Sequence, residues 1–405
     1  MFLTLFPISH RRYSDSPAVH WLQGFAVWLV ARGYSRKALR GHVQRLRQAL
    51  ERAGTVASDE RWTSEQLTRL FEFPTHAHYP ATEHNFRRYL MENGRLICEP
   101  EFGRFTSLLA AYRIYLLELC GLVPQTAKHH LDTVYTFLCQ SLAATQMLNA
   151  LSNQAVEAFI VATGQRLKRQ TLKQTIGHLR MFLRYCYNHG DIPTRLDSID
   201  SPRIYAGERP PRALAWDLAI GLLASIDISD PGGVRDHAML YLIAYFGLRP
   251  SEVALLKLDS IDWRSRTLRV EQSKTRSSLV LPLPEEAIQV LKRYVRDGRP
   301  DSTHEALFLH QRAPAGALTS AAIRSVYRKR ARQSGLPLDG SSPYSLRHGF
   351  AMRLLGRGVG IKTIGDLMGH RALESTCVYL RLQIDALREV GLPLPVSTAA
   401  TRGAS

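Results

Sequence analysis

Cysteine is scarce in this chain, and its five residues are scattered without any C-x-x-C pair. An odd number without paired spacing argues against both a disulfide framework and a cysteine zinc site. Long apolar runs are also absent, since no stretch approaches the roughly 20 residues that cross a membrane. The apolar start, residues 1–8, lacks the charged residues and the small-residue cleavage site of a signal peptide. We therefore expect a cytoplasmic protein without a membrane segment.

Acidic residues are too few to balance the basic ones. The chain has 53 lysines and arginines against 35 aspartates and glutamates, which gives a formal net charge of +18. Such an excess favours a polyanionic partner, of which nucleic acid is the commonest. A basic protein that is merely soluble would show the same balance, so charge alone does not decide between these interpretations.

The 405 residues are 45% hydrophobic, which is enough to bury more than one core in two or three domains. In the first two hundred residues, apolar side chains recur at helical spacing and stop at glycines such as Gly33 and Gly121. This pattern predicts helices at about residues 21–30, 36–52, 108–119, 125–140, 155–162 and 169–189.

Arg249 stands at a predicted helix entrance. An apolar helix over residues 236–246 is followed by Gly247-Leu248-Arg249-Pro250-Ser251-Glu252. Proline belongs at the first position of a helix, and Glu252 in the first turn lies near enough to orient Arg249. A guanidinium held in this way offers paired donors to two phosphate oxygens and keeps its charge. A helix cap with a surface salt bridge would look the same.

Further along, residues 267–270 and 278–283 alternate in polarity and predict a β-hairpin, whose basic tip contains Lys274 and Arg276. The stretch Ser342-Pro343-Tyr344-Ser345-Leu346-Arg347-His348 then predicts a helix that begins at Pro343. Tyr344 and Arg347 are three positions apart and share one face of it.

One more helix, through Ile361 and Leu367, is expected to end at Gly369, so that His370 emerges at a helix end. Tyr379 follows nine positions later, and we expect it on a short helix that starts near Ser375.

Taken together and in this order, these motifs resemble the active-site signature of the tyrosine recombinases, the phage integrase family. The resemblance implies a mainly α fold with a small antiparallel β-sheet. It places a helical core-binding domain at residues 101–200, a linker at 201–212 and the catalytic domain at 213–393. Residues 1–100 would be an additional helical N-terminal region, and 394–405 a disordered tail.

The resemblance also implies the roles of the site residues. Tyr379 would be the nucleophile that forms a 3′-phosphotyrosyl link to DNA. Arg249, Arg347 and His370 would neutralise the phosphate oxygens, and Lys274 would protonate the departing 5′-oxygen, with Arg276 as its rival if the hairpin register is shifted. Neither metal nor nucleotide cofactor is expected, because the chain has no Walker loop, carboxylate cluster or zinc spacing.

Tyr344 is the one clear departure, because family members usually carry histidine at this position. A phenol can donate a hydrogen bond to a phosphate oxygen, but its ordinary pKa near 10 makes it a poor general base at neutral pH. We expect His348 to pack or to support the site. A part in replacing the missing histidine is the alternative.

The expected partner is double-stranded DNA, bound by a homo- or hetero-tetramer that can include partner recombinases. Basic residues of the core-binding region would contact phosphates, although a solvated basic helix is the alternative for any one of them: Arg166, Lys168, Arg169, Lys173, Arg180 and Arg184. Residues 1–100 would be a second DNA-contacting module or an interface between protomers. Apolar residues 380–390 would dock into a neighbouring protomer or pack on their own domain.

Three functions remain open at this point. The first is a site-specific recombinase or integrase that serves integration, excision or transposition of a mobile element. The second is a DNA-binding partner subunit with weak cleavage, and the third is a type IB topoisomerase-like enzyme that relaxes DNA.

Overall fold

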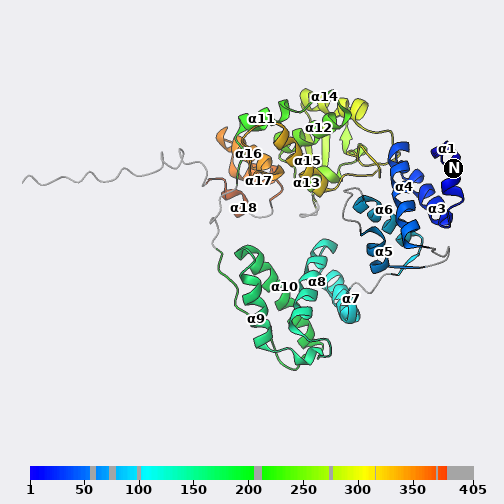
Figure 1. The fold of residues 1–405 in the computed structure, drawn as a ribbon. Helices are drawn as coiled ribbons and strands as arrows, with labels where there is room; N and C mark the ends of the chain where they lie inside the picture. Colours follow the sequence, from blue (N-terminus) through cyan, green and yellow to red (C-terminus); the bar gives the residue numbers. More distant parts are fainter. Residues whose placement is uncertain are drawn as a thin grey trace, which may run out of the picture. The chain divides into compact units, whose positions relative to one another are not determined.

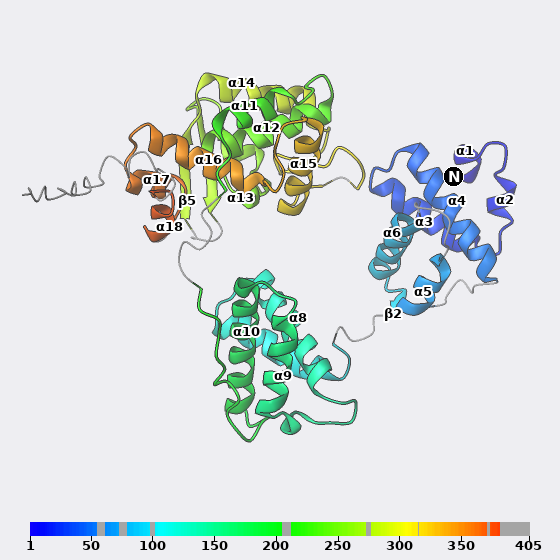
Figure 2. The same cartoon turned by 60° about the vertical axis from the view of Figure 1, so that its left-hand side comes forward.

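The computed structural model describes residues 1–54, 61–72, 79–97, 102–204, 212–272, 277–314, 316–370 and 373–380. One compact unit consists mainly of residues before 205, and the other mainly of residues from 212 on. Helices predominate in both units, and a small antiparallel sheet lies in the second (Figures 1 and 2). The predicted fold class is therefore confirmed. In the part of the chain described, no helix is both long and apolar enough to cross a membrane.

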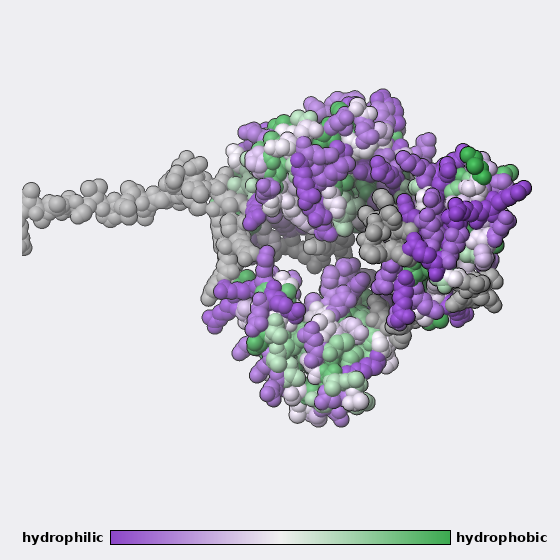
Figure 3. Space-filling model, in the orientation of Figure 1, coloured by the Kyte–Doolittle hydropathy of each residue, from purple (hydrophilic) through white to green (hydrophobic). Residues whose placement is uncertain are grey.

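The N-terminal helices enclose an aromatic core. Trp21 and Phe25 both meet Phe86 edge to face, with ring centroids 6.2 and 5.4 Å away. Hydrophilic side chains cover most of the visible face of these helices in Figure 3. The elements are α1 (Phe2–Leu5), α2 (Arg11–Ser14), α3 (Val19–Ala31), α4 (Arg36–Ala53), α5 (Ser64–Phe71) and α6 (Tyr79–Glu92), with a short parallel pair, β1 (Trp62–Thr63) and β2 (Leu96–Ile97), that the sequence did not predict.

The region after residue 102 is a helical bundle. Helices α7 and α9 pack against α8, and α10 packs against both α8 and α9. Its core includes Leu109, Tyr112, Phe137 and Phe182, all fully buried. The elements are η1 (Gly103–Phe105), α7 (Thr106–Ile114), the π-helical turn η2 (Tyr115–Leu119), α8 (Pro124–Ser141), η3 (Leu148–Ala150), α9 (Asn153–Gly164) and α10 (Arg169–Asn188), close to the predicted bounds.

Two of the basic residues on α10 contact the segment that follows this helix. Arg180 Nε donates to the carbonyl of Ile199 at 3.0 Å. Arg184 Nε lies 3.0 Å from Asp197 Oδ2, and the hydrogen bond from Arg195 leads the interactions that lower the pKa of Asp197 to about 2. Arg180 and Arg184 thus also fasten the segment after α10, and their predicted contact with phosphates stays a prediction.

The second unit is built around helix α12, much of which is buried. It contacts α11, α13, α14, α15 and α16. The elements are α11 (Trp216–Ala224), α12 (Pro231–Phe246), α13 (Pro250–Leu255), η4 (Leu258–Ser260), β3 (Ile261–Asp262), β4 (Thr267–Gln272), β5 (Ser277–Pro282), α14 (Glu285–Arg293), η5 (Tyr294–Gly298), α15 (Ser320–Gln333), α16 (Pro343–Gly356), α17 (Ile361–Leu367) and α18 (Glu374–Cys377).

The sheet of this unit has the order β3-β4-β5 and is antiparallel throughout. Its β4–β5 register pairs Leu268 with Leu281 and Gln272 with Ser277, which confirms the predicted hairpin. Lys274 and Arg276 at its tip, most of the predicted linker 201–212 and the predicted tail 394–405 lie outside the described residues.

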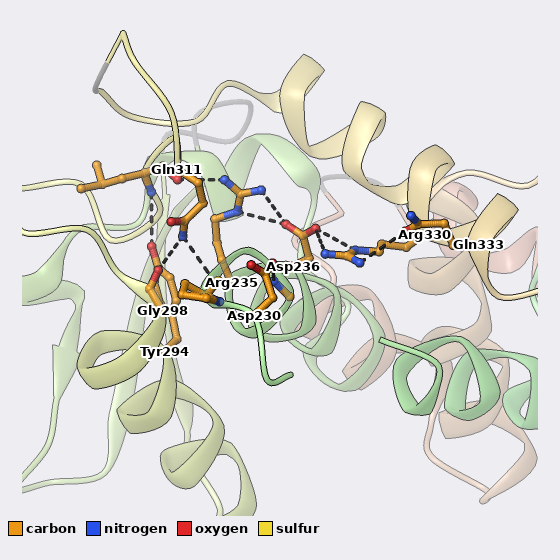
Figure 4. A network of polar contacts seen from close by, with 11 residues as sticks. Asp230, Arg235, Asp236, Tyr294, Gly298, Gln311, Arg330 and Gln333 are labelled. Atoms are coloured by element: carbon orange, nitrogen blue, oxygen red, sulfur yellow. Dashed lines mark hydrogen bonds and ion pairs between the residues drawn. The ribbon is translucent and has the colours of Figure 1, made fainter. Parts of the chain in front are cut away.

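A buried charge network fastens the first half of α12 to α15 (Figure 4). Asp236, only 1% exposed, accepts from Arg235 Nε at 3.0 Å and from Arg330 Nε at 2.8 Å. A pocket of about 600 Å³ opens beside this network, and none of the predicted site residues lines it. The two guanidiniums compensate the charge of the buried carboxylate. The network thereby links α12 to α15.

Candidate active site

Arg249 is held at the entrance of α13 by the residue predicted to orient it. Helix α12 ends at Gly247, whose φ of +64° suits glycine. Glu252 Oε2 accepts the backbone N–H of Arg249 at 2.7 Å, and its Oε1 accepts from Arg249 Nη1 at 2.5 Å. Nη2 of Arg249 donates to the carbonyl of Gly369 at 3.1 Å. The guanidinium therefore has a fixed position beside the loop that carries His370.

Arg347 meets the same carboxylate from α16. Its Nη1 lies 3.7 Å from Glu252 Oε2, and its guanidinium donates to the carbonyls of Gly247 and Met368. The side chain is buried, and this burial and the charge of Arg249 lower the pKa of Arg347 to about 10. Arg347 thus remains positive at neutral pH, and both guanidiniums share one counter-charge.

His370 follows Gly369, which ends α17 with a φ of +58°. A Cβ at Gly369 would lie 2.1 Å from Gln272 Oε1, so a larger residue there would displace the Gln272 side chain at the end of β4. His370 Nδ1 lies 2.8 Å from Thr376 Oγ1. Burial, followed by the charges of Arg347 and Arg249, lowers the pKa of His370 to about 4, so the imidazole is neutral at pH 7.

Tyr379 lies in a turn two residues after α18 ends, so the prediction of a helical position is wrong. Its ring is 1% exposed and packs with Ala351, Ile364 and Met368. The hydroxyl oxygen lies 2.7 Å from His348 Nδ1. Burial raises the pKa of Tyr379 to about 12, against the opposing effect of Arg347 and Arg249. The phenol is therefore protonated at neutral pH.

Tyr344 lies in the first turn of α16 and is exposed. Its phenol is close enough to raise the pKa of Arg347 slightly against the larger lowering effects. It makes no hydrogen bond with the residues that the structure describes. The structure thus gathers Arg249, Arg347, His370 and Tyr379, with Tyr344 at the border of the group.

Three contacts in this group were not predicted from the sequence. Glu252 also faces Arg347, Thr376 positions His370, and Gln272 fills the space beside Gly369. Among the described residues, no cluster of three or more histidine, cysteine, aspartate or glutamate side chains could hold a metal ion.

Comparison with known proteins identifies the relatives of this chain. Residues 219–385 match the model of the phage integrase family. The chain is 34% identical over 235 residues to the tyrosine recombinase XerC of Pelotomaculum thermopropionicum, covering 56% of this chain and 75% of the relative. It is 29% identical over 396 residues to y4rA of Sinorhizobium fredii, an inferred integrase/recombinase, covering 95% and 96% of the two chains.

Two solved structures share the fold. A lambda integrase dimer bound to a COC' core site superposes with a TM-score of 0.53 at 19% identity, covering 67% of this chain and 94% of that one. The Tn1549 transposon integrase in complex with transposon right end DNA gives a TM-score of 0.55 at 16% identity, covering 69% and 99%. The chain therefore belongs to the phage integrase family. Within it, the chain is a site-specific recombinase of the tyrosine class.

Proposed function

We propose that Tyr379 attacks a DNA phosphate and forms a 3′-phosphotyrosyl link, while Arg249, Arg347 and His370 bind the non-bridging oxygens. The observation that carries this proposal is the convergence of the two guanidiniums, the neutral imidazole and the buried phenol from four separate segments. Preorganised donors of this kind stabilise the charge that develops on a phosphate in the transition state.

The charge of the site favours an anion. Two guanidiniums face a single carboxylate, so the three groups together carry +2 − 1 = +1. A phosphate that enters the site would neutralise this positive excess. The Thr376 hydroxyl can donate a hydrogen bond to His370 Nδ1. The Nε2–H of His370 is then left to donate a hydrogen bond to a phosphate oxygen.

Two further roles complete the proposed reaction. Lys274, at the hairpin tip outside the described residues, protonates the departing 5′-oxygen. Tyr344, exposed beside Arg347, donates a hydrogen bond to the phosphate. The resulting 3′-phosphotyrosyl bond stores the phosphodiester energy until another 5′-hydroxyl attacks it.

The substrate is double-stranded DNA, and the reaction serves integration, excision or transposition of a mobile element. Similar folds have been solved as a lambda integrase dimer on a core site and as a Tn1549 integrase with transposon end DNA, which supports this substrate. Because recombination joins two duplexes with two cuts in each, four protomers act together, as a homo-tetramer or with partner recombinases. The curated relatives are named recombinases, so the topoisomerase and weak-subunit interpretations are not favoured.

Incubation with end-labelled DNA from the ends of its mobile element, followed by denaturing electrophoresis, tests the proposal. The wild-type protein is expected to give protein-linked DNA. Tyr379→Phe is expected to bind the same DNA and to give no linked product. Binding without any adduct from the wild type, with its partner recombinases supplied, would refute the proposal.

A further inference from the structure

His348 lies against the atom of Tyr379 that reacts. It follows Arg347 on α16 and is half-buried. The two rings are inclined at 52° with their centroids 5.6 Å apart, so they do not stack. The contact is instead the 2.7 Å approach of His348 Nδ1 to the hydroxyl oxygen. This distance lies within the range required between a general base and the oxygen whose proton it removes.

We propose that His348 is the general base that removes the phenolic proton of Tyr379. The inference rests on the proposed function, because it assigns the base of the same reaction. Tyr344, on the same helix, carries a phenol and is therefore a poor base at neutral pH. His348 stands one helical turn further along that helix.

The protonation states of the two groups suit this transfer. Tyr379 keeps its proton at neutral pH, because burial raises its pKa to about 12. Burial and the charge of Arg347 lower the pKa of His348, so its imidazole is neutral. A neutral imidazole can accept at Nδ1, and the phenol therefore donates its proton toward that nitrogen.

The other candidate groups are less well placed. His370 Nδ1 is engaged by Thr376 Oγ1, and its ring lies nearly parallel to that of Tyr379 with centroids 6.5 Å apart. Tyr344 is exposed and carries a phenol, which is a weak base. Among the described residues, His348 is the hydrogen-bond partner recorded for the Tyr379 hydroxyl.

The step balances without any further reagent. As the tyrosine oxygen bonds to phosphorus and the bond from phosphorus to the 5′-oxygen breaks, the phenolic proton passes to His348 Nδ1. The 5′-oxygen takes its proton from a separate donor, which the proposed function assigns to Lys274. When a 5′-hydroxyl later attacks the phosphorus, its proton passes to the neutral amine left on Lys274, and the imidazolium returns its proton to the leaving tyrosine oxygen.

The test compares His348→Gln with a matched control. Glutamine can hydrogen-bond but cannot accept a proton at neutral pH. His237→Gln is the control, because His237 is also half-buried, has a lowered pKa and lies 6.1 Å from a tyrosine ring, that of Tyr241 on α12. Single-turnover adduct formation is followed from mildly acidic to alkaline pH, and DNA binding by electrophoretic mobility shift.

At pH 7 we expect His348→Gln to form adduct about 10²–10⁴-fold more slowly than wild type, with unchanged DNA binding. The His237 control is expected to match wild type. The variant's rate should keep rising at alkaline pH where the wild-type rate levels off. Added imidazole should restore part of the rate in His348→Ala, which a purely structural role does not explain.

An adduct rate in His348→Gln equal to that of wild type would overturn the inference alone and leave the proposed function intact. Absence of adduct from the wild type would remove the proposed function and the inference together.

If the His348 variants do not fold, NMR of the histidine ring ¹⁵N resonances in wild type and in Tyr379→Phe tests the inference instead. The inference expects the Nδ1 resonance of His348 to shift when the phenol is removed. An unchanged resonance would overturn it.

Discussion

Glu252 places one buried carboxylate between Arg249 and Arg347. Its Oε1 lies 2.5 Å from Arg249 Nη1, and its Oε2 lies 3.7 Å from Arg347 Nη1. The carboxylate is 2% exposed and also accepts the backbone N–H of Arg249. It thereby sets the separation and orientation of the two guanidiniums before any phosphate arrives.

Replacing this carboxylate should destabilise the catalytic unit. Glu252→Gln preserves the shape but leaves Arg347 buried beside Arg249 without a counter-charge, so we expect a loss of about 3 kcal/mol in the free energy of unfolding. Glu305→Gln, which removes an exposed partner of Lys257, should change it far less, because water screens an exposed ion pair. Urea denaturation measures both, and equal effects would contradict this account of Glu252.

Two glycines with positive φ offer a matched pair. Gly358 has a φ of +78° and open space around it, so Gly358→Ala should lose about 1 kcal/mol through backbone strain. Gly247 has a φ of +64°, and a Cβ there would lie 2.4 Å from Phe350 Cδ1. Its carbonyl also accepts from Arg347. Gly247→Ala should therefore be the less stable of the two on thermal unfolding and should slow adduct formation, whereas equal stability would exclude the clash.

The stability of the helical bundle formed by α7 to α10 should fall in acid. His130 and His178 lie with ring centroids 3.9 Å apart, and His178 also contacts Thr133. Burial, followed by the neighbouring histidines, lowers the pKa of His130 to about 4, and burial and His129 lower that of His178. Because the unfolded chain then binds more protons, the stability is complete above about pH 6.5 and is lost as the pH falls toward 4.

His130→Gln removes one of these groups and should reduce that dependence. The difference between urea midpoints at pH 7.5 and pH 5 is expected to be smaller in the variant than in wild type. An identical difference would show that His130 does not bind a proton on unfolding.

DNA binding should weaken steeply with added salt, because phosphate contacts release counterions. Lys173 is exposed on α10, and Lys173→Gln should lower the slope of log affinity against log salt by about 1. Arg184→Gln should lower it less, because Arg184 is already paired with Asp197. Fluorescence anisotropy over a salt series measures both slopes. A flat response in wild type would refute the contribution of basic helices to binding.

Much of the fold could be predicted from local chemistry. Helices α4, α8 and α10 follow their apolar spacing, and α17 ends before Gly369 because glycine accepts a positive φ. Arg249 and Glu252 are three residues apart in one helix entrance, so their pairing was also visible in the sequence.

Contacts between distant segments could not be predicted in this way. Arg184 pairs with Asp197 because the chain turns back after α10, and Gln272 meets Gly369 because the hairpin ends beside α17. The approach of His348 to Tyr379 likewise depends on how the turn after α18 packs on α16. Local patterns identify each of these residues as polar and say nothing of its partner.

Mapping of the DNA-linked residue tests the central claim most directly. The adduct formed with DNA labelled at either end is isolated and digested with protease, and the linked peptide is sequenced by mass spectrometry. The account predicts a single phosphotyrosyl link at Tyr379, with the cleaved strand attached through its 3′ phosphate and a free 5′-hydroxyl on the other fragment. A link at Tyr344 or any other residue, or attachment through a 5′ phosphate, would contradict it.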